Sequence, residues 1–282
     1  MAAFWLKALA VGLASGTLSG AFGIGGGVIT TPAIRLLLGG SAMSAIATPL
    51  PVIIPTAVTG AMSYFRRGLA DARAGLLLGA SGAPAAVGGA LLAGVIGGSS
   101  LLIATAVLLA YLAVDMTLQA GKAAPAAEAS VRVAEDGPLG AEGVRAPAED
   151  RRRSIPGVGL SARLALLGVV TGLYSGLLGL GGGFVLVPAL MRFFGYSAKR
   201  AIGTSLVAIA LLSIPGTITH YFLGHIDVPL ALALSVSVIP GSLLGARITA
   251  AASERHVRFG FAALLVVAGA LLIVNEAGVL AR

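Results

Sequence analysis

The sequence has 282 residues, of which 57% are hydrophobic and 11% charged, with a formal net charge of +8. A soluble domain carries about 25% charged residues, so this composition excludes a soluble single-core protein and a largely disordered chain. The 41 glycines and the 5% aromatic share are typical of closely packed membrane helices. Because the chain has no cysteine, disulfides, thiolate metal sites and a cysteine nucleophile are also excluded.

Apolar runs predict the helices in chain order, five on each side of a polar segment. They cover about 4–22, 28–38, 42–65, 74–97 and 100–118 before this segment, and about 158–178, 184–195, 198–222, 228–250 and 257–274 after it. Four runs in each half approach the roughly 20 residues of a membrane-spanning helix, whereas the second is too short to cross as a straight helix. We therefore expect an all-α polytopic membrane protein.

The polar segment 119–157 separates two predicted transmembrane repeats, 1–118 and 158–282. Six cations and six anions share this segment with many Ala, Pro and Gly residues, which predicts a disordered linker. Because its charges cancel, the whole net charge of +8 belongs to the apolar repeats.

The two repeats match each other at an offset of 156 residues. Both contain the pattern G-x₃-G-x₂-SG-x₂-G-x-GGG-x₄-PA, starting at Gly12 and at Gly168. A shared string of this length indicates an internal duplication. It also predicts that the run 4–22 is a retained helix and not a cleaved signal peptide, because its counterpart 158–178 lies inside the chain.

Positive charge switches sides between equivalent turns of the two repeats. The turn 66–73 carries three arginines and its counterpart 222–229 carries none, while the uncharged turns 39–44 and 97–100 have basic counterparts. Short cytoplasmic loops carry the Lys and Arg excess, so equivalent turns should lie on opposite membrane sides. We expect two inverted-topology repeats in the cytoplasmic membrane, a cytoplasmic linker and external termini. The first two segments of each repeat form either a re-entrant hairpin or two crossings.

Three consecutive glycines precede the short run of each repeat. They predict a helix break followed by a half-helix, whose free N–H groups and positive dipole end suit an anion. Nearby Ser and Thr hydroxyls, and an Arg inside an apolar run, suit the same ligand. The predicted substrate-binding residues are Ser19, Gly23, Gly25, Gly26, Gly27, Thr48, Ser175, Gly179, Gly181, Gly182, Gly183, Thr204 and Arg247.

Each of these residue types also has a purely structural interpretation. Glycines spaced by four let helices approach closely or end them, and Ser or Thr bonds back to its own helix. Arg247 is near enough to a helix end to snorkel. Asp71 and Asp227 match across the repeat and are best explained as N-caps and not as a proton relay. His220 either titrates near neutral pH or is an interfacial polar anchor.

The doubled glycine motif, the linker and the ten apolar runs resemble the sulfite exporter TauE/SafE family of membrane permeases. The resemblance covers nearly the whole chain except the linker. It implies export of sulfite or organosulfonates across the cytoplasmic membrane of a bacterium. The motif identifies the family and leaves the individual solute open.

The resulting prediction is a secondary transporter that exports a small sulfur-containing anion by alternating access. We expect no catalytic residue, no metal and no cofactor; the expected partners are the anion and the lipid bilayer, not nucleic acid, with a homodimer left open. The alternatives are a cation-coupled importer or a channel for another small solute, and an intramembrane enzyme.

The orientation of the repeats is testable by labelling, because the natural chain is already free of cysteine. A single cysteine introduced in the turn 66–73 should react only from the cytoplasmic side, and one at 223–228 only from outside. Impermeant maleimides applied to cells and to inverted vesicles make the measurement. Reaction of both positions from the same side would contradict inverted topology.

Overall fold

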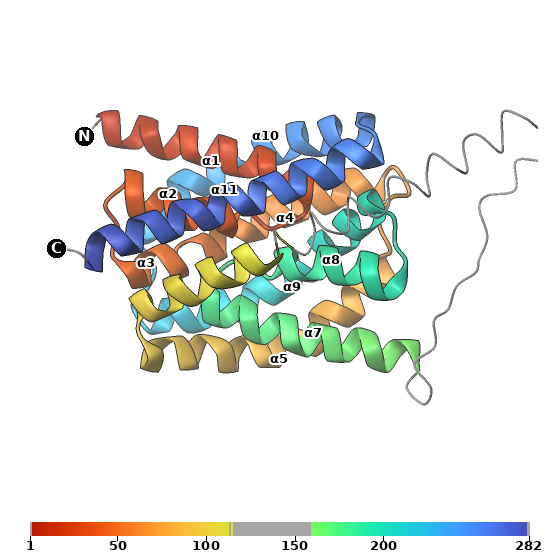
Figure 1. Cartoon of the computed structure of the whole chain (residues 1–282), viewed down its shortest axis with the longest axis horizontal. Coiled ribbons are helices and arrows are strands. Elements are labelled where there is room, and N and C mark those ends of the chain that lie inside the picture. Colours follow the sequence, from red (N-terminus) through yellow and green to blue (C-terminus); the bar gives the residue numbers. More distant parts are fainter. Residues whose placement is uncertain (1, 113, 115–158, 281–282) are drawn as a thin grey trace, which may run out of the picture.

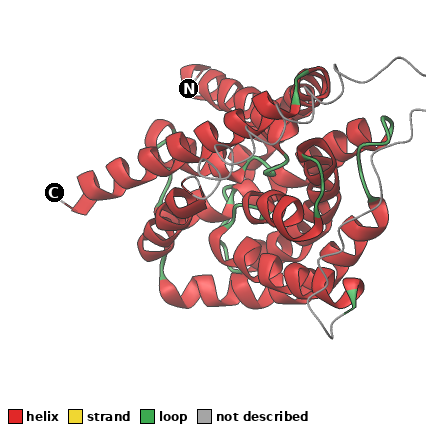
Figure 2. Ribbon diagram, turned by 45° about the vertical axis from the view of Figure 1, so that its right-hand side comes forward, coloured by secondary structure: helices red, strands yellow, loops and turns green. Residues whose placement is uncertain are grey.

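The computed structural model describes residues 2–112, 114 and 159–280, with side chains up to 271; the predicted linker 119–157 lies outside these residues. The described chain forms helices joined by short loops and contains no strand (Figures 1 and 2). In order, the helices are α1 (Ala2–Phe22), α2 (Gly27–Leu37), α3 (Ala42–Ala47), α4 (Pro49–Phe65), α5 (Ala72–Ile96), a short helix Gly98–Leu112, α7 (Leu160–Leu178), α8 (Gly183–Phe194), α9 (Ala198–Phe222), α10 (Val228–Ala251) and α11 (Glu254–Leu280).

Six helices of the described chain are long and apolar enough to cross a membrane, namely α1, α3 with α4, α5, α7, α9 and α10. α2 and α8 are short, which confirms the predicted half-helices. Large apolar side chains such as Leu6, Leu166 and Val236 are exposed on the outer surface, where they meet lipid in a bilayer. The chain is therefore an all-α polytopic membrane protein.

The third apolar run differs between the two halves because of its prolines. In the first half it breaks at Thr48, and Pro49 is the first residue of α4. Thr48 keeps helical angles (φ −61°, ψ −30°), but proline lacks an N–H, so Pro49 and Pro51 cannot donate to the carbonyls four residues earlier. The equivalent of Pro49 is Ser205, and α9 runs through this position without interruption. The prolines thus make the third run asymmetric between the two halves.

Glycine stripes join two pairs of parallel helices. Gly16 of α1 lies against the backbone of Val238 in α10, and its equivalent Gly172 of α7 lies against Gly82 in α5. A Cβ at either position would collide with backbone atoms of the partner helix. These glycines therefore serve helix packing, the structural interpretation that the spacing favoured.

Equivalent residues of the two halves make reciprocal contacts across the molecule. The backbone N–H of Asp71 donates to Thr204 Oγ1 at 3.0 Å, and that of Asp227 donates to Thr48 Oγ1 at 3.1 Å. α1 starts at the left of Figure 1 beside the N-terminus, whereas α7 starts at the right and runs the opposite way. This antiparallel course of equivalent helices supports the hypothesis of inverted repeats.

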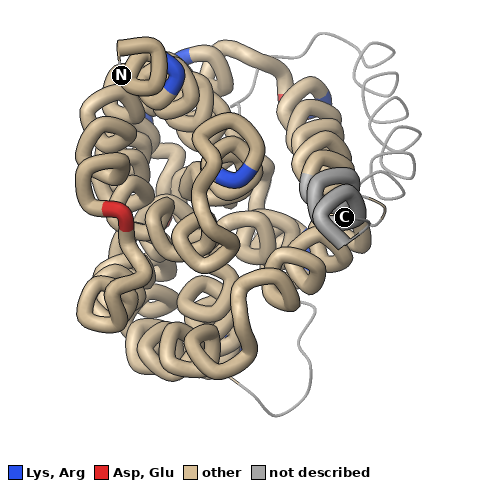
Figure 3. The backbone as a smooth tube through the Cα atoms, turned by 90° about the vertical axis from the view of Figure 1, so that its left-hand side faces the viewer, with Lys and Arg blue, Asp and Glu red and all other residues tan. Residues whose placement is uncertain are grey.

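The described cations gather at one end of the molecule. Here the turns before α5, α9 and α11 meet, because Asp71 binds Tyr196 and Arg200, and Glu254 binds the N–H of Ala198. These turns and the adjoining helix ends carry Arg66, Arg67, Arg73, Arg163, Arg192, Lys199, Arg200, Arg247, Arg255 and Arg258. The other end carries Lys7 and Arg35. In Figure 3, which views the molecule from this end, the nearer backbone is almost entirely tan, the colour of residues without charge.

Asp71 and Asp227 are N-caps, as predicted. Asp71 Oδ1 accepts from the N–H of Ala74 at the start of α5, and Asp227 Oδ1 accepts from Leu230 at the start of α10, each at 3.1 Å. Burial raises the pKa of Asp71, but the Ala74 N–H, the Tyr196 hydroxyl and Arg200 together bring it below its usual value. Burial and the bond to Asp71 raise the pKa of Tyr196 to about 12.

This difference between the two caps predicts different effects of their removal. Asp227→Ala should cost roughly 1 kcal/mol, the usual value of an N-cap, and Asp71→Ala should cost more because Tyr196 and Arg200 lose their acceptor. The pKa of Asp71 is depressed in the folded state. The stability that its carboxylate contributes is therefore complete above the ordinary carboxyl pKa and is lost as the pH falls through the folded-state pKa. Thermal unfolding in detergent between pH 3 and 7 measures both; equal losses that do not change with pH would contradict the network.

Candidate functional site

Two glycine loops, 23–26 and 179–182, lead into the half-helices. Gly23, Gly25 and Gly26 have φ angles of 69°, 79° and 85°. The equivalent residues Gly179, Gly181 and Gly182 have φ angles of 67°, 77° and 77°. L-residues rarely adopt this conformation, so glycine is required for the chain to turn here. The predicted helix break is confirmed, and the half-helices begin at Gly27 and Gly183.

The two loops lie against one another. A Cβ on Gly27 would come within 2.7 Å of Leu180 Cα, and a Cβ on Gly183 within the same distance of Ile24 Cα. Ile24 and Leu180 are fully buried. The fold thus brings together the two glycine motifs that are 156 residues apart, as the predicted site requires.

Two equivalent isoleucines close the space beside these loops. Ile53 comes from α4 and Ile209 from α9, and both approach Gly25 and Gly181. A Cβ on Gly25 would lie 3.0 Å from Ile209 Cγ2 and 3.1 Å from Ile53 Cγ2. The loops are therefore capped by an apolar pair, and this conformation is closed at the predicted site.

Ser19 and Ser175 are buried beside the starts of the half-helices. Both are 0% exposed, and no described residue forms a hydrogen bond with either hydroxyl oxygen. Ser19 Oγ is 3.8 Å, and Ser175 Cβ 3.7 Å, from where a Cβ on Gly26 or Gly182 would lie. A buried hydroxyl without a partner costs about 1–3 kcal/mol. Together with the free N–H groups of a first helical turn, each serine provides donors for a ligand oxygen.

Two carbonyl oxygens of the first loop, those of Gly23 and Gly26, already have side-chain donors. Ser15 and Thr30 donate to the Gly26 carbonyl at 3.1 and 3.0 Å, and Ser205 donates to that of Gly23 at 2.9 Å. In the second half Thr171, the equivalent of Ser15, bonds to Leu167 of its own helix. The two sites are consequently similar in shape but differ in how firmly their loops are held.

Three other predicted residues, a threonine pair and an arginine, have other partners or face outward. Thr48 and Thr204 are fully buried, but each hydroxyl accepts the N–H of an aspartate from the opposite half, which gives it a structural partner. Arg247 is exposed on the outer face of α10, next to the exposed Leu244 and Ile248. Its assignment to the substrate site is therefore corrected: the side chain points outward, because snorkelling toward water costs less than burying its charge.

Sequence reasoning missed Ser15, Ser205 and the isoleucine pair. The repeat alignment carried a signal for Ile53 and Ile209, which are identical residues at the 156-residue offset. Nothing in the sequence pairs Ser15 with Thr30, whose oxygens are 2.6 Å apart in the structure. Within the described part of the chain, no three His, Asp or Glu residues are grouped as a metal site requires.

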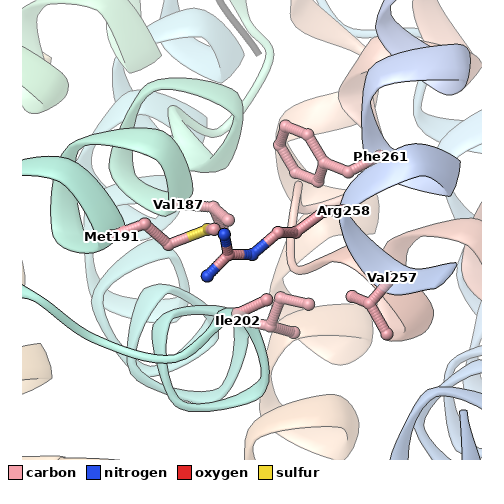
Figure 4. Close-up of a pocket in the computed structure, with 7 residues that line it drawn as sticks. Val187, Met191, Ile202, Val257, Arg258 and Phe261 are labelled. Carbon is pink, nitrogen blue, oxygen red and sulfur yellow. The ribbon is translucent and has the colours of Figure 1, made fainter. Parts of the chain in front are cut away.

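A shallow notch without room for a water-sized solute lies outside this centre, between α8, α9 and α11. Figure 4 shows Arg258 reaching from α11 toward Val187 and Met191 of α8, with Ile202 below them. The Arg258 Nε is buried and has no partner among the described residues. None of the predicted site residues lines this notch, so it is distinct from the glycine loops.

The sequence profile described as sulfite exporter TauE/SafE matches residues 8–272. The chain belongs to this family. It is 27% identical over 253 residues to the probable membrane transporter protein YunE of Bacillus subtilis (strain 168), covering 87% of each chain. It is 25% identical over 266 residues to a probable membrane transporter protein of Xylella fastidiosa (strain 9a5c), covering 94% of this chain and 91% of the relative.

Over a shorter stretch the identity is higher. The chain is 35% identical over 117 residues to the probable membrane transporter protein MJ0441 of Methanocaldococcus jannaschii, and the match covers 38% of this chain and 43% of the relative. No solved structure matches the chain. Membership of the family and the names of the relatives establish a membrane transporter of this class.

The strained glycines of this family member predict a graded loss of stability. Gly182→Ala should destabilise the protein more than Gly26→Ala, because its Cβ would collide with Thr171, while the nearest atom to a Cβ on Gly26 is the Ser15 hydroxyl at 3.0 Å. Gly88→Ala is the control, since that helical position opens onto free space, and it should be neutral or slightly stabilising. Unfolding temperatures in detergent test the order, and Gly182→Ala as stable as Gly88→Ala would contradict the strained geometry.

Proposed function

We propose that this protein exports small sulfur oxyanions, sulfite or an organosulfonate, across the cytoplasmic membrane. The supporting observation is the pair of buried, unpartnered hydroxyls of Ser19 and Ser175 beside the half-helix starts. The two glycine loops between them touch. The names of the relatives support transport and not catalysis.

An oxyanion fits this centre for chemical reasons. The first N–H groups of α2 and α8 have no acceptor within their helices, and both helix dipoles point their positive ends inward. Each charge-assisted hydrogen bond to an anion contributes about 1.5–3 kcal/mol. The glycines leave the backbone uncovered, so a small anion approaches the N–H groups directly. Sulfite should bind better than sulfate, which is larger and doubly charged.

The donors on the loop carbonyls weigh against the cation-coupled alternative. A bound cation needs free carbonyl oxygens, but those of Gly23 and Gly26 already accept bonds from Ser205, Ser15 and Thr30. The serine hydroxyls next to them can donate to an anion, and so can the first N–H groups of the half-helices, which have no acceptor capacity. This polarity favours a negatively charged solute.

The mechanism follows from the closed centre and its two ends. Alternating access requires Ile53 and Ile209 to move apart toward one side at a time. The reciprocal bonds Asp71–Thr204 and Asp227–Thr48 lie at opposite ends of α9 and hold both ends shut in this conformation. Opening at one end breaks one of these bonds while the other persists.

We place the cation-rich end in the cytoplasm and the repeats in inverted orientation. Short cytoplasmic loops carry most Lys and Arg residues, and the turns before α5, α9 and α11 carry them here. The linker 119–157 is then cytoplasmic and both termini are external. Export is driven by gradients of ions or of the substrate.

Binding and stability of the two serine variants test the proposal together. Ser19→Ala and Ser175→Ala should each weaken sulfite binding by roughly tenfold to a hundredfold, the equivalent of one charge-assisted bond. The same changes should leave the unliganded protein as stable or more stable, because they remove a buried unsatisfied hydroxyl. Calorimetric titration and unfolding temperature give the two readings.

Ser81→Ala is the matched control, since the Ser81 hydroxyl bonds to Leu78 of its own helix away from the loops. It should bind sulfite like the natural protein. Serine variants that fold and bind sulfite normally would show that the site lies elsewhere, and saturable counterflow in proteoliposomes would distinguish a carrier from a channel.

A further inference from the structure

A pair of histidines, one buried and one half-buried, occupies the end of α9 opposite the cation-rich end. His220 belongs to the last turn of α9 and is 0% exposed. His225 follows in the turn to α10, and the two Nδ1 atoms are 3.1 Å apart, with the ring centroids 5.3 Å apart. A nitrogen–nitrogen contact of this length is a hydrogen bond with one proton between the rings.

The protonation of this pair is limited by its partners. His220 Nε2 is 3.0 Å from the Gly176 carbonyl, which only accepts, so Nε2 carries a proton. In the neutral pair, His220 Nδ1 accepts from His225 Nδ1–H. One additional proton fits on either ring while the bond between them persists. A second would place two N–H groups face to face, so the pair stores one proton.

The groups packed around the two histidines do not provide another site that could bind this proton. α7 contributes the Gly176 carbonyl, and α5 contributes Gly94, where a Cβ would lie 3.7 Å from His225 Cε1. Asp227 is the charged side chain of the same turn, but its Oδ1 caps α10 through Leu230. The neighbouring Tyr221 is exposed.

The first half has the same hydrogen bond to an equivalent glycine carbonyl, but it lacks the pair of histidines. Tyr64 is the equivalent of His220, and its hydroxyl donates to the carbonyl of Gly20 at 3.1 Å, as His220 does to that of Gly176. Leu69 is the equivalent of His225. A phenol ionises far above the physiological range. The duplication therefore leaves a proton-binding pair at only one end of the molecule.

The pair also touches both moving parts of the proposed transport cycle. Gly176 directly follows Ser175 in α7, so the bond from His220 positions the turn that carries this serine. His225 is two residues before Asp227, whose N–H binds Thr48 and closes this end. A change in the charge of the pair is thus felt at the site and at the closure.

We infer that the His220–His225 pair binds the proton that couples anion export to the proton gradient. This inference rests on the proposed function and names its co-substrate. The proton is taken up from outside when this end opens to water after the anion has left, is held while this end is closed, and is released when the opposite end opens, so that it moves inward as the anion moves outward. The anion and the proton therefore use neighbouring turns of α7 and α9 in alternation.

The repeat supplies matched variants for the test. His220→Tyr and His225→Leu install the residues of the first half, and His256→Gln is the control, because His256 is exposed at the other end and bonds only locally to Ser253. In proteoliposomes, sulfite counterflow at equal pH should persist in all three. Accumulation of sulfite driven by a pH gradient should fall to the level without a gradient in the first two and persist in His256→Gln.

The outcomes separate this inference from the function beneath it. Counterflow absent from the natural protein would overturn the proposed function. Counterflow with gradient-driven accumulation in both His220→Tyr and His225→Leu would overturn proton coupling alone. The pH gradient changes the ionisation of sulfite equally for the natural protein and all variants. A difference in accumulation between them therefore comes from the protein. Should His220→Tyr fail to insert, His225→Leu and His225→Gln carry the test with the same two readings.

Discussion

This fold depends on direct contact between the backbones of neighbouring segments at glycine positions. Where Gly16 meets Val238 and Gly172 meets Gly82, no side chain separates the helices. At the centre, Gly27 and Gly183 let the two loops touch, which no larger residue permits. In a bilayer, apolar side chains gain nothing by leaving lipid for one another, so close packing replaces the hydrophobic effect as the source of cohesion.

Much of the architecture was predictable because it is local. The three consecutive glycines break the helix in each half, an aspartate before an apolar run caps it, and the prolines separate α3 from α4 where α9 stays continuous. The offset of 156 residues also predicted which positions are equivalent. These features follow from a few neighbouring residues, and the structure confirms the predicted helix breaks and caps.

The composition of the site was less predictable because it depends on distant pairs. Thr48 and Thr204 serve aspartates of the opposite half, and Arg247 faces outward, which the position of a residue within its own run does not reveal. The same applies to Ile53 and Ile209, which reach the loops from two crossing helices. A sequence specifies which groups are present, whereas the crossing of helices decides which of them meet.

The reciprocal contacts have a consequence for the history of the chain. Asp71 finds Thr204 and Asp227 finds Thr48, so neither half closes its own end. A polypeptide consisting of one half would satisfy these bonds only by meeting a second copy running in the opposite direction. If the repeats are inverted, an ancestor of half this length would have had to insert in both orientations, and fusion through a linker would have made the opposed pair permanent. Only after fusion could one copy become His220 and His225 while the other kept Tyr64 and Leu69.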